Sequence, residues 1–248
     1  MQSPPSLRRV LVIGNSDGIG RALVQRLLAE SDPAGRVGND GAAPAWAVTG
    51  LSRRPSPDLP EDAHVVCDVT APDYAAVLRQ LVERRGPFDV VVWCVGIGET
   101  FEPASLEHEL RVLDTNFRQA VVTLEALLPG MLERGSGHFV GLSSLADRAL
   151  IPEAPSYSAS KAGLSSYLEA LALACRPRGV HVTNVRFGFV DTKMGRARWR
   201  PFLISAERAA GVVRGAFDTR PIRLSHPKLA CLAMQAASAL MAVRLWFA

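Results

Sequence analysis

A tyrosine and a lysine one helical turn apart are the residues of this sequence best placed to move a proton. The stretch SYSASK puts the phenol of Tyr157 and the ammonium of Lys161 on one face of a helix. A free phenol has a pKa of about 10, and a neighbouring cation favours the phenolate and lowers that pKa. Carbonyl reduction needs a proton donor whose pKa lies closer to neutral as hydride reaches the carbon. The pair therefore predicts acid–base chemistry at a carbonyl or an alcohol.

Two polar residues upstream could serve the same reaction. Ser144 ends a predicted strand and can donate a hydrogen bond to the same substrate oxygen. Asn116, in DTNFRQA, could hold water and backbone in a proton path that leads to Lys161. A tyrosine–lysine pair alone is usually an exposed amphipathic pair, and the serine could equally be a loop hydroxyl. The order of all four residues along the chain favours the catalytic interpretation.

Three glycines between the first predicted strand and the first predicted helix indicate a nucleotide site. The turn GNSDGIG carries Gly14, Gly18 and Gly20. Such a turn lets backbone N–H groups approach a pyrophosphate at the positive end of the following helix. Its spacing is G-x-x-x-G-x-G rather than G-x-G-x-x-G, and any tight strand-to-helix turn uses glycine. The position after the first strand favours nucleotide binding, with further contacts at Ser16, Asp17 and Ile19.

The end of the second predicted strand favours NADP(H) over NAD(H). A carboxylate there would accept a hydrogen bond from the adenosine ribose 2′-hydroxyl, whereas an arginine binds a 2′-phosphate. The stretch LSRRP offers Arg53 and Arg54 and no acid. Two solvated surface arginines are the alternative interpretation, so NAD(H) stays open as a cofactor.

Two later stretches would border the same crevice. Asp68 and Val69, in CDVT, follow the third predicted strand, and the Asp68 carboxylate could accept from the adenine amino group. Cys94, Val95 and Gly96 end the fourth predicted strand and allow a close backbone approach. Each stretch alone is ordinary loop chemistry. Together, in chain order, they trace a dinucleotide along the carboxyl ends of the strands.

Strand-length apolar runs alternate with longer helical patterns along the 248 residues. Valine-rich strands without alternation are buried on both faces, and repeated strand–helix units favour an α/β fold with a doubly wound parallel sheet of Rossmann type. We expect a single domain over residues 1–248. The predicted strands are 9–14, 45–51, 63–67, 88–95, 137–143, 179–187 and a short 221–225. The predicted helices are 18–30, 72–85, 105–134, 156–175 and 227–246, and residues 31–44 form a loop.

These motifs together resemble the short-chain dehydrogenase/reductase family from about residue 9 to 225. The residues that match the family pattern are Gly14-x-x-x-Gly18-Ile19-Gly20, Asp68, Gly96, Asn116, Ser144, Tyr157-x-x-x-Lys161, Gly188 and Thr192. The resemblance implies that Tyr157 is the general acid/base and that Lys161 binds the nicotinamide ribose and lowers the phenol pKa. It also implies that Ser144 orients the carbonyl and that Asn116 supports proton relay.

The resemblance extends to the nicotinamide end of the cofactor. It implies that backbone at Val190 and the hydroxyl of Thr192 contact the carboxamide. Three positions depart from the family pattern: Ile13 replaces a threonine, Trp93-Cys94-Val95-Gly96 replaces Asn-Asn-Ala-Gly, and Phe187 replaces the proline of a Pro-Gly pair. These changes affect the cofactor contacts and leave the four reactive residues intact.

Residues 193–205 would form a lid over the substrate. Met194, Trp199, Phe202 and Leu203 suggest an apolar wall, and the arginines of this stretch could meet an acidic group: Arg196, Arg198 and Arg200. A surface lid with exposed arginines is an equal alternative. A hydrophobic alcohol or ketone, or an acyl thioester, is the substrate that we expect.

The predicted C-terminal helix, residues 227–246, is unusually apolar. Its stretch from Leu229 to Val243 is about 22 Å long as a helix, whereas a bilayer core needs roughly 30 Å. Arg244 and Trp246 would suit an interfacial helix. A core helix or a subunit contact explains the same apolarity and is favoured over membrane contact.

Composition narrows the class of protein. The net charge is only +4, and no basic run with interleaved aromatics indicates a nucleic-acid partner. The four cysteines lack CxxC spacing, which predicts small buried residues in a reducing, cytoplasmic setting and no metal site. We expect a homodimer or homotetramer that acts as an NADP(H)-dependent oxidoreductase on a small carbonyl or alcohol. An NADPH-binding sensor without turnover and a membrane-associated reductase of a lipid-like ketone are the alternatives.

Overall fold

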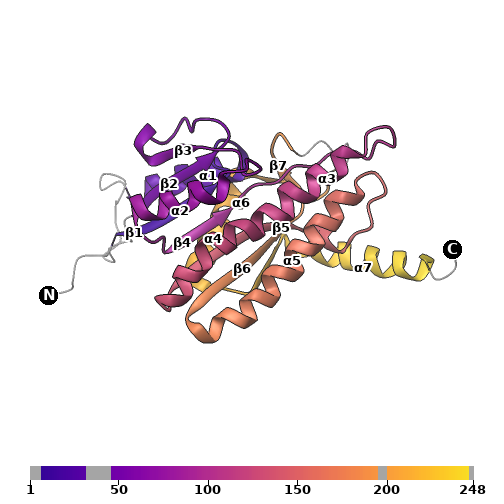
Figure 1. Cartoon of the computed structure of the whole chain (residues 1–248). Coiled ribbons are helices and arrows are strands. Elements are labelled where there is room, and N and C mark those ends of the chain that lie inside the picture. The colour runs from indigo at the N-terminus through magenta and orange to yellow at the C-terminus, as the bar shows by residue number, and fades with distance from the viewer. Residues whose placement is uncertain (1–6, 32–45, 195–199, 246–248) are drawn as a thin grey trace.

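A parallel sheet organises the computed structural model, which describes residues 7–31, 46–194 and 200–245 (Figure 1). Within these residues the sheet has seven strands in the order β3-β2-β1-β4-β5-β6-β9, each parallel to its neighbours. The strands are β1 Arg8–Ile13, β2 Trp46–Ser52, β3 His64–Val66, β4 Val90–Trp93, β5 Gly137–Ser144, β6 Val180–Phe187 and β9 Arg223–His226. Two short strands, β7 Val190–Asp191 and β8 Ile204–Ser205, pair separately.

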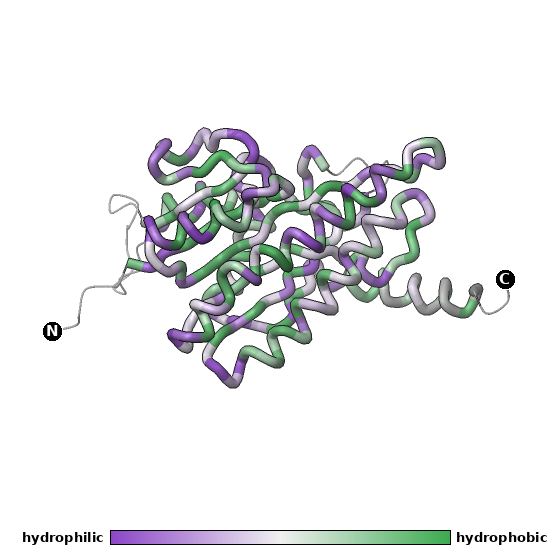
Figure 2. The backbone as a smooth tube through the Cα atoms, in the orientation of Figure 1, coloured by the Kyte–Doolittle hydropathy of each residue, from purple (hydrophilic) through white to green (hydrophobic). Residues whose placement is uncertain are grey.

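Helices cover both faces of this sheet, as predicted. They are α1 Gly18–Ser31, α2 Tyr74–Arg85, α3 Glu107–Leu113, α4 Gln119–Glu133, α5 Pro155–Cys175, α6 Ala206–Thr219 and α7 Lys228–Leu245. Val10 and Val12 of β1 pack in one apolar cluster with α1 and α6. Leu11 and Ile13 pack in a second cluster with α2, α4 and α5. Figure 2 shows the consequence as green strands at the centre and purple turns at the rim. The doubly wound α/β fold is confirmed.

The order of the strands reverses beside β1. The chain adds β2 and β3 on one side of β1 and then returns to place β4 on the other side. In open sheets of this kind, ligands bind outside the carboxyl ends of the strands where the order reverses. The turns that follow β1 and β4 therefore border the expected site, and both carry predicted cofactor residues.

Two helical predictions needed correction. The predicted helix 105–134 consists of α3, a π-helical segment (Asp114–Arg118) and α4. The helix α6 was not predicted, although Ser205 caps it by accepting from the backbone N–H of Arg208 at 3.2 Å. Its buried residues recur with helical spacing and provided a usable signal: Ala209, Ala210, Val213, Ala216 and Phe217.

The cysteines, the predicted loop and the apolar C-terminal helix can also be compared with the structure. Within the described residues no disulfide joins the four cysteines. Only Cys175 is buried, and Cys67, Cys94 and Cys231 keep partial exposure. The loop predicted at 31–44 falls, after its first residue, outside the described residues. Among the described helices, none combines the length and apolarity needed to cross a bilayer.

Candidate active site

Helix α5 carries the phenol and the ammonium together. It begins at Pro155, whose fixed φ and missing N–H suit a first helical turn. Tyr157 and Lys161 both lie within this helix, four residues and therefore about one turn apart. The Lys161 Nζ lies 5.9 Å from the centre of the Tyr157 ring. Lys161 is only 4% exposed, and its Nζ donates to the backbone carbonyl of Leu142 on β5 at 3.1 Å. The lysine is therefore an interior residue of the site and not part of a solvated helix face.

Asn116 links α5 to the segment that follows β4. Its Oδ1 accepts from the Ile97 N–H at 2.7 Å, and its Nδ2 donates to the Ile97 carbonyl at 2.8 Å. Its Nδ2 also donates to Ser160 Oγ at 3.0 Å, and Ser160 donates to the Tyr157 carbonyl at 2.8 Å. Asn116 lies in the π-helical segment, a local distortion that frequently marks a functional site.

Ser144 is the last residue of β5 and lies against the phenol. Its hydroxyl lies close enough to Tyr157 to act on the phenol and to favour a lower phenol pKa. The Ser144 Oγ also accepts from the N–H of Ala146 at 3.1 Å and donates to the Phe187 carbonyl at 3.4 Å. The strand end thus holds the serine hydroxyl beside the tyrosine, as its position in the sequence suggested.

The electrostatics differ from the expectation for the phenol. Burial is the largest influence on Tyr157 and raises its pKa above 10, while the neighbouring Ser144 hydroxyl opposes this shift. Burial also lowers the pKa of Lys161, to about 8, because the ammonium is costly to enclose. The predicted lowering of the phenol pKa by Lys161 is therefore wrong for the chain itself. The ammonium is directed to the Leu142 carbonyl, and desolvation outweighs its attraction for a phenolate.

The glycine turn after β1 provides a cradle that side chains would fill. Gly14 has a φ of +88° and Gly18 a φ of +52°. A Cβ on Gly20 would lie 2.2 Å from the Gly14 carbonyl oxygen, so only glycine fits there. A Cβ on Gly18 would lie 3.1 Å from the Thr192 Cγ2. The turn after β1 and the segment after β7 therefore meet, as a cofactor spanning both would require.

Gly96, which has no side chain, leaves a similar space next to Lys161 and Asn116. A Cβ at this position would lie 3.3 Å from Lys161 Nζ and 3.7 Å from Asn116 Oδ1. The same point is 3.5 Å from the Cε of Met194, and a Cβ on Gly98 would lie 3.6 Å from the Tyr157 ring. These residues fit a nicotinamide dinucleotide that runs from the glycine turn to Tyr157. Burial raises the pKa of the neighbouring Cys94 thiol to about 12, so that thiol stays neutral.

Charged residues gather at the other end of this path. Arg54 Nη2 lies 3.6 Å from Asp17 Oδ2, and Arg53 Nη1 lies 3.9 Å from Asp68 Oδ2, with both arginines largely exposed. Lys193 Nζ lies 2.8 Å from Asp17 Oδ2 and, through this hydrogen bond, holds the Asp17 pKa below its usual value. The Asp17–Lys193 pair was not predicted, since nothing in the sequence links two residues so far apart.

The remaining predicted cofactor residues occupy the turns around this path. Asp68 accepts from the N–H and hydroxyl of Thr70 at 2.9 and 2.8 Å, which fixes its carboxylate in the turn after β3. Val69 and Val190 are buried, while Ser16, Ile19 and Val95 keep partial exposure.

The substrate side is described only in part. Met194, Phe202 and Leu203 are each partly exposed, as an apolar wall requires. Arg196, Arg198 and Trp199 lie outside the described residues. Arg200 Nη1 lies 3.2 Å from Asp191 Oδ1, so this arginine has a carboxylate partner. The predicted lid ends in β8, which pairs with β7.

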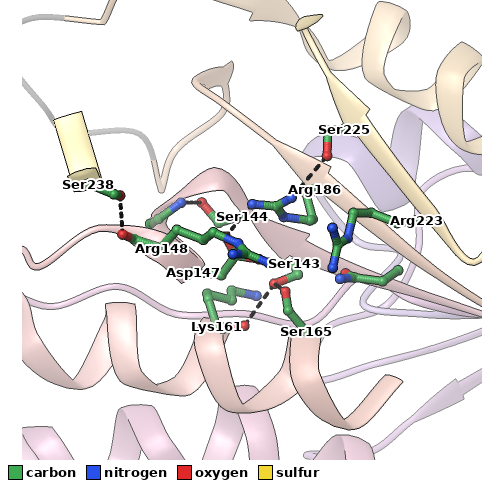
Figure 3. A network of polar contacts seen from close by, with 12 residues as sticks. Ser143, Ser144, Asp147, Arg148, Lys161, Ser165, Arg186, Arg223, Ser225 and Ser238 are labelled. Atoms are coloured by element: carbon green, nitrogen blue, oxygen red, sulfur yellow. Dashed lines mark hydrogen bonds and ion pairs between the residues drawn. The ribbon is translucent and has the colours of Figure 1, made fainter. Parts of the chain in front are cut away.

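A buried ion pair that the sequence did not reveal supports the turn after Ser144 (Figure 3). Arg186 of β6 donates to Asp147 at 2.6 Å, and the two side chains are 3% and 4% exposed. Arg186 also donates to Ser225 Oγ of β9 at 3.2 Å. From the other side, Ser238 of α7 donates to the Arg148 carbonyl. The turn Leu145–Arg148, called η4 below, is thus tied to β6 and α7.

Comparisons with known proteins agree with this geometry. Residues 8–201 match the family model for short chain dehydrogenases. An uncharacterized oxidoreductase of Myxococcus xanthus is 34% identical over 238 residues, 90% of each chain. An acetoacetyl-CoA reductase of Allochromatium vinosum is 31% identical over 75% of this chain and 76% of its own. A putative ketoacyl reductase of Streptomyces coelicolor is 35% identical over 74% of this chain and 71% of its own.

Solved structures share the fold. A short-chain dehydrogenase of Streptomyces avermitilis superposes with a TM-score of 0.76 at 24% identity, covering 97% of this chain and 94% of that one. An aldohexose dehydrogenase of Thermoplasma acidophilum superposes with a TM-score of 0.71 at 22% identity, covering 89% of this chain and 92% of that one. Because the family model spans most of the chain and the reactive residues lie together at the carboxyl edge of the sheet, this chain belongs to the short-chain dehydrogenase/reductase family of oxidoreductases, whose members use NAD(H) or NADP(H).

Proposed function

We propose that this protein is an NADP(H)-dependent oxidoreductase that interconverts a carbonyl and a secondary alcohol, with Tyr157 as general acid/base. The observation that carries the proposal is the placement of the Ser144 hydroxyl and the Tyr157 phenol beside the buried Lys161, at the space left by Gly96. A proton donor, a second hydroxyl and a cation meet there at the end of a cofactor cradle.

Each residue has a distinct task in this proposal. A bound nicotinamide supplies hydride to the substrate carbon, or accepts it in the reverse direction. The Tyr157 hydroxyl gives its proton to the carbonyl oxygen during reduction and recovers it during oxidation. The Ser144 hydroxyl orients that oxygen by a hydrogen bond. The Lys161 ammonium stabilises the phenolate that reduction leaves, because the site is shielded from water and opposite charges attract more strongly there.

Asn116 is a positioning residue in the same proposal. It holds the Ile97 backbone and, through Ser160, the first turn of α5. Both contacts fix the distance between the Gly96 segment and Tyr157. The predicted proton path through Asn116 to Lys161 remains part of the proposal, since both Asn116 Oδ1 and Lys161 Nζ face the space at Gly96.

An apolar ketone or an acyl thioester is the proposed substrate class. Met194 lies over Gly96 and Gly98, and the partly exposed Phe202 and Leu203 continue the apolar surface in the sequence. The relatives named acetoacetyl-CoA reductase and putative ketoacyl reductase support the same class. The test is a panel of 3-oxoacyl thioesters, apolar ketones and alcohols, assayed by nicotinamide absorbance with each cofactor. Tight NADPH binding without turnover on the whole panel would instead support the sensor alternative.

Arg53 and Arg54 carry the proposed preference for NADP(H). Both are exposed at the end of β2, with no acid next to them in the chain. Losing one arginine–phosphate contact costs about 1.5–3 kcal/mol, so Arg53→Ala should raise the KM for NADPH by about tenfold to a hundredfold. The KM for NADH should change little. Arg178→Ala is the control, because Arg178 is also exposed but precedes β6, at the amino ends of the strands and away from the proposed cofactor path. Equal losses for both cofactors would contradict the preference.

A further inference from the structure

Helix α7 presents large aliphatic side chains to solvent. It follows β9 and runs outward from the sheet (Figure 1). Leu229 is 65% exposed, Leu232 63%, Leu240 73% and Val243 58%. Ala236, in the middle of the helix, is also exposed. These five residues, which we call the α7 stripe, follow one another at intervals of 3, 4, 4 and 3 positions and cover an arc of only about 80° at 3.6 residues per turn.

The opposite face of α7 is the one that holds the helix to the protein. Ala230 is 6% exposed and lies 3.5 Å from the position of a Cβ on Gly188. The Ser238 hydroxyl donates to the Arg148 carbonyl in η4. On the helical wheel, Ala230 and Ser238 lie about 120° and 160° from Ala236. The α7 stripe is thus the outward face of an anchored helix, and no part of the chain that the structure describes covers it.

The spacing of the stripe is the same in both directions. Counted outward from Ala236, large aliphatic residues stand four and seven positions away on each side. When two copies of such a helix pack antiparallel about a two-fold axis through Ala236, Leu232 meets Leu240 and Leu229 meets Val243. The small side chain at the centre lets the two helices approach closely. A two-fold interface uses the same patch on both copies, which is what a palindromic stripe provides.

We propose that the α7 stripe is the interface between two copies of this chain, paired antiparallel through α7. Intervals of three and four residues in a narrow arc are typical of a seam between two helices. An interfacial membrane helix instead needs a broad apolar face opposite a polar face rich in lysine and arginine. From Leu229 to Val243 the sequence has no charged residue, and alanines flank the stripe. The stripe therefore fits one facing helix better than a lipid surface.

A hollow beside α7 gives room for the partner. It measures about 470 Å³ and lies between β9 and the first turns of the helix. Its lining residues are Arg223, Leu224, Ser225, Lys228, Cys231 and Leu232. In the antiparallel register, Leu232 faces Leu240 of the second copy, so the C-terminal turns of that copy's helix pass beside this hollow.

Disulfide formation tests the symmetry of the pairing. In the full chain carrying Cys231→Ser, Ala236→Cys should place two thiols on the two-fold axis and give a covalent dimer on mild oxidation. Ala233→Cys, an exposed position one turn away, should cross-link at least about tenfold more slowly, because its symmetry mate lies at the other side of the axis. Equal cross-linking of the two variants would overturn the proposal.

Sedimentation velocity tests the same interface without a cross-link. Leu232→Glu and Leu240→Glu should each halve the mass of the assembly, because the charge would be buried in the seam. Both side chains are exposed within one chain, so the thermal melting transition should be retained. Val66→Glu is the control, since Val66 is 59% exposed on β3, the opposite edge strand.

Two results would overturn the pairing. One is an unchanged mass in both glutamate variants. The other is a wild-type chain that floats with anionic phospholipid vesicles and loses this binding in Leu240→Glu while its mass stays the same. The second result would assign the stripe to lipid.

Discussion

At the scale of single residues, the site contains a buried lysine whose ammonium is bound by a backbone carbonyl and not by a carboxylate. Lys161 is 4% exposed, and the Leu142 carbonyl is its hydrogen-bond acceptor. A cation in such a place favours its neutral form, which explains the fall of its pKa from 10.5 to about 8. The same surroundings raise the pKa of the Tyr157 phenol, so the phenol is protonated at neutral pH and ready to act as an acid.

The pKa of Lys161 can be measured directly because the chain has only three lysines, Lys161, Lys193 and Lys228. Its folded pKa lies below its ordinary value, so the ammonium is present below about pH 8 and is lost as pH rises through that value. In NMR spectra of chain labelled at lysine Cε, one signal should therefore titrate at about pH 8, and Lys161→Met should remove it. The kcat/KM for reduction should fall over the same range. If the Lys161 signal shows no titration below about pH 10, the ammonium stays charged and this electrostatic account is contradicted.

That Tyr157, Lys161 and Ser144 lie together could be predicted from their spacing in the sequence. Tyr157 and Lys161 share a helix face at any four-residue interval, and Ser144 is fixed by the end of a valine-rich strand. The direction of the phenol pKa shift could not be predicted, because it depends on how completely the fold excludes water. The Asp17–Lys193 pair was equally hidden, since only the tertiary structure brings those loops together.

At the scale of elements, the turn η4 is the support of Ser144. It is held by the ion pair between Asp147 and Arg186, and the two side chains are almost fully buried. Two charges in low dielectric stabilise little as a pair, but either one alone is costly. The pair therefore acts as a geometric constraint that joins the end of β5 to β6, next to the hydroxyls of Ser144 and Tyr157.

Breaking this ion pair should cost far more than breaking an exposed one. Asp147→Asn leaves the Arg186 charge buried without its partner and should lower the free energy of unfolding by about 3–5 kcal/mol in urea titrations. The double variant Asp147→Leu with Arg186→Met should recover most of that loss. Asp62→Asn, which removes an exposed partner of Arg85, should cost less than about 1 kcal/mol. A loss for Asp147→Asn as small as that of Asp62→Asn would show that η4 does not depend on the pair.

The strands and helices could be predicted where the hydrophobic pattern of the sequence is continuous. The buried strands follow from valine-rich runs, and their observed ends differ from the predicted ones by no more than a few residues. The π-helical segment at Asn116 was missed because it is only five residues long and has an α-helix on each side, so the whole stretch has one helical pattern. The helix α6 could have been predicted, because its buried positions recur with helical spacing and form a clear apolar face on the sequence.

At the scale of the whole molecule, strand order determines where chemistry can occur. The reversal beside β1 brings the glycine turn, Gly96 and the ends of β5 and β6 to one edge of the sheet. This arrangement could be predicted from repeated strand–helix units, because parallel strands require crossovers on both faces. We further propose that residues 1–248 act as one domain, since the two apolar clusters share the central sheet. What α7 packs against could not be predicted, because an apolar helix suits a core, a partner or a membrane equally well by composition.

The central claim is that Tyr157 donates the proton while hydride reaches the carbonyl carbon. Tyr157→Phe keeps the ring and removes only the hydroxyl, so turnover should fall by roughly 10²–10⁴-fold, the scale of general acid catalysis. NADPH affinity, measured by fluorescence titration of the same preparation, should stay within about threefold of wild type. Near-normal turnover in Tyr157→Phe with any substrate that the wild type reduces would contradict the account.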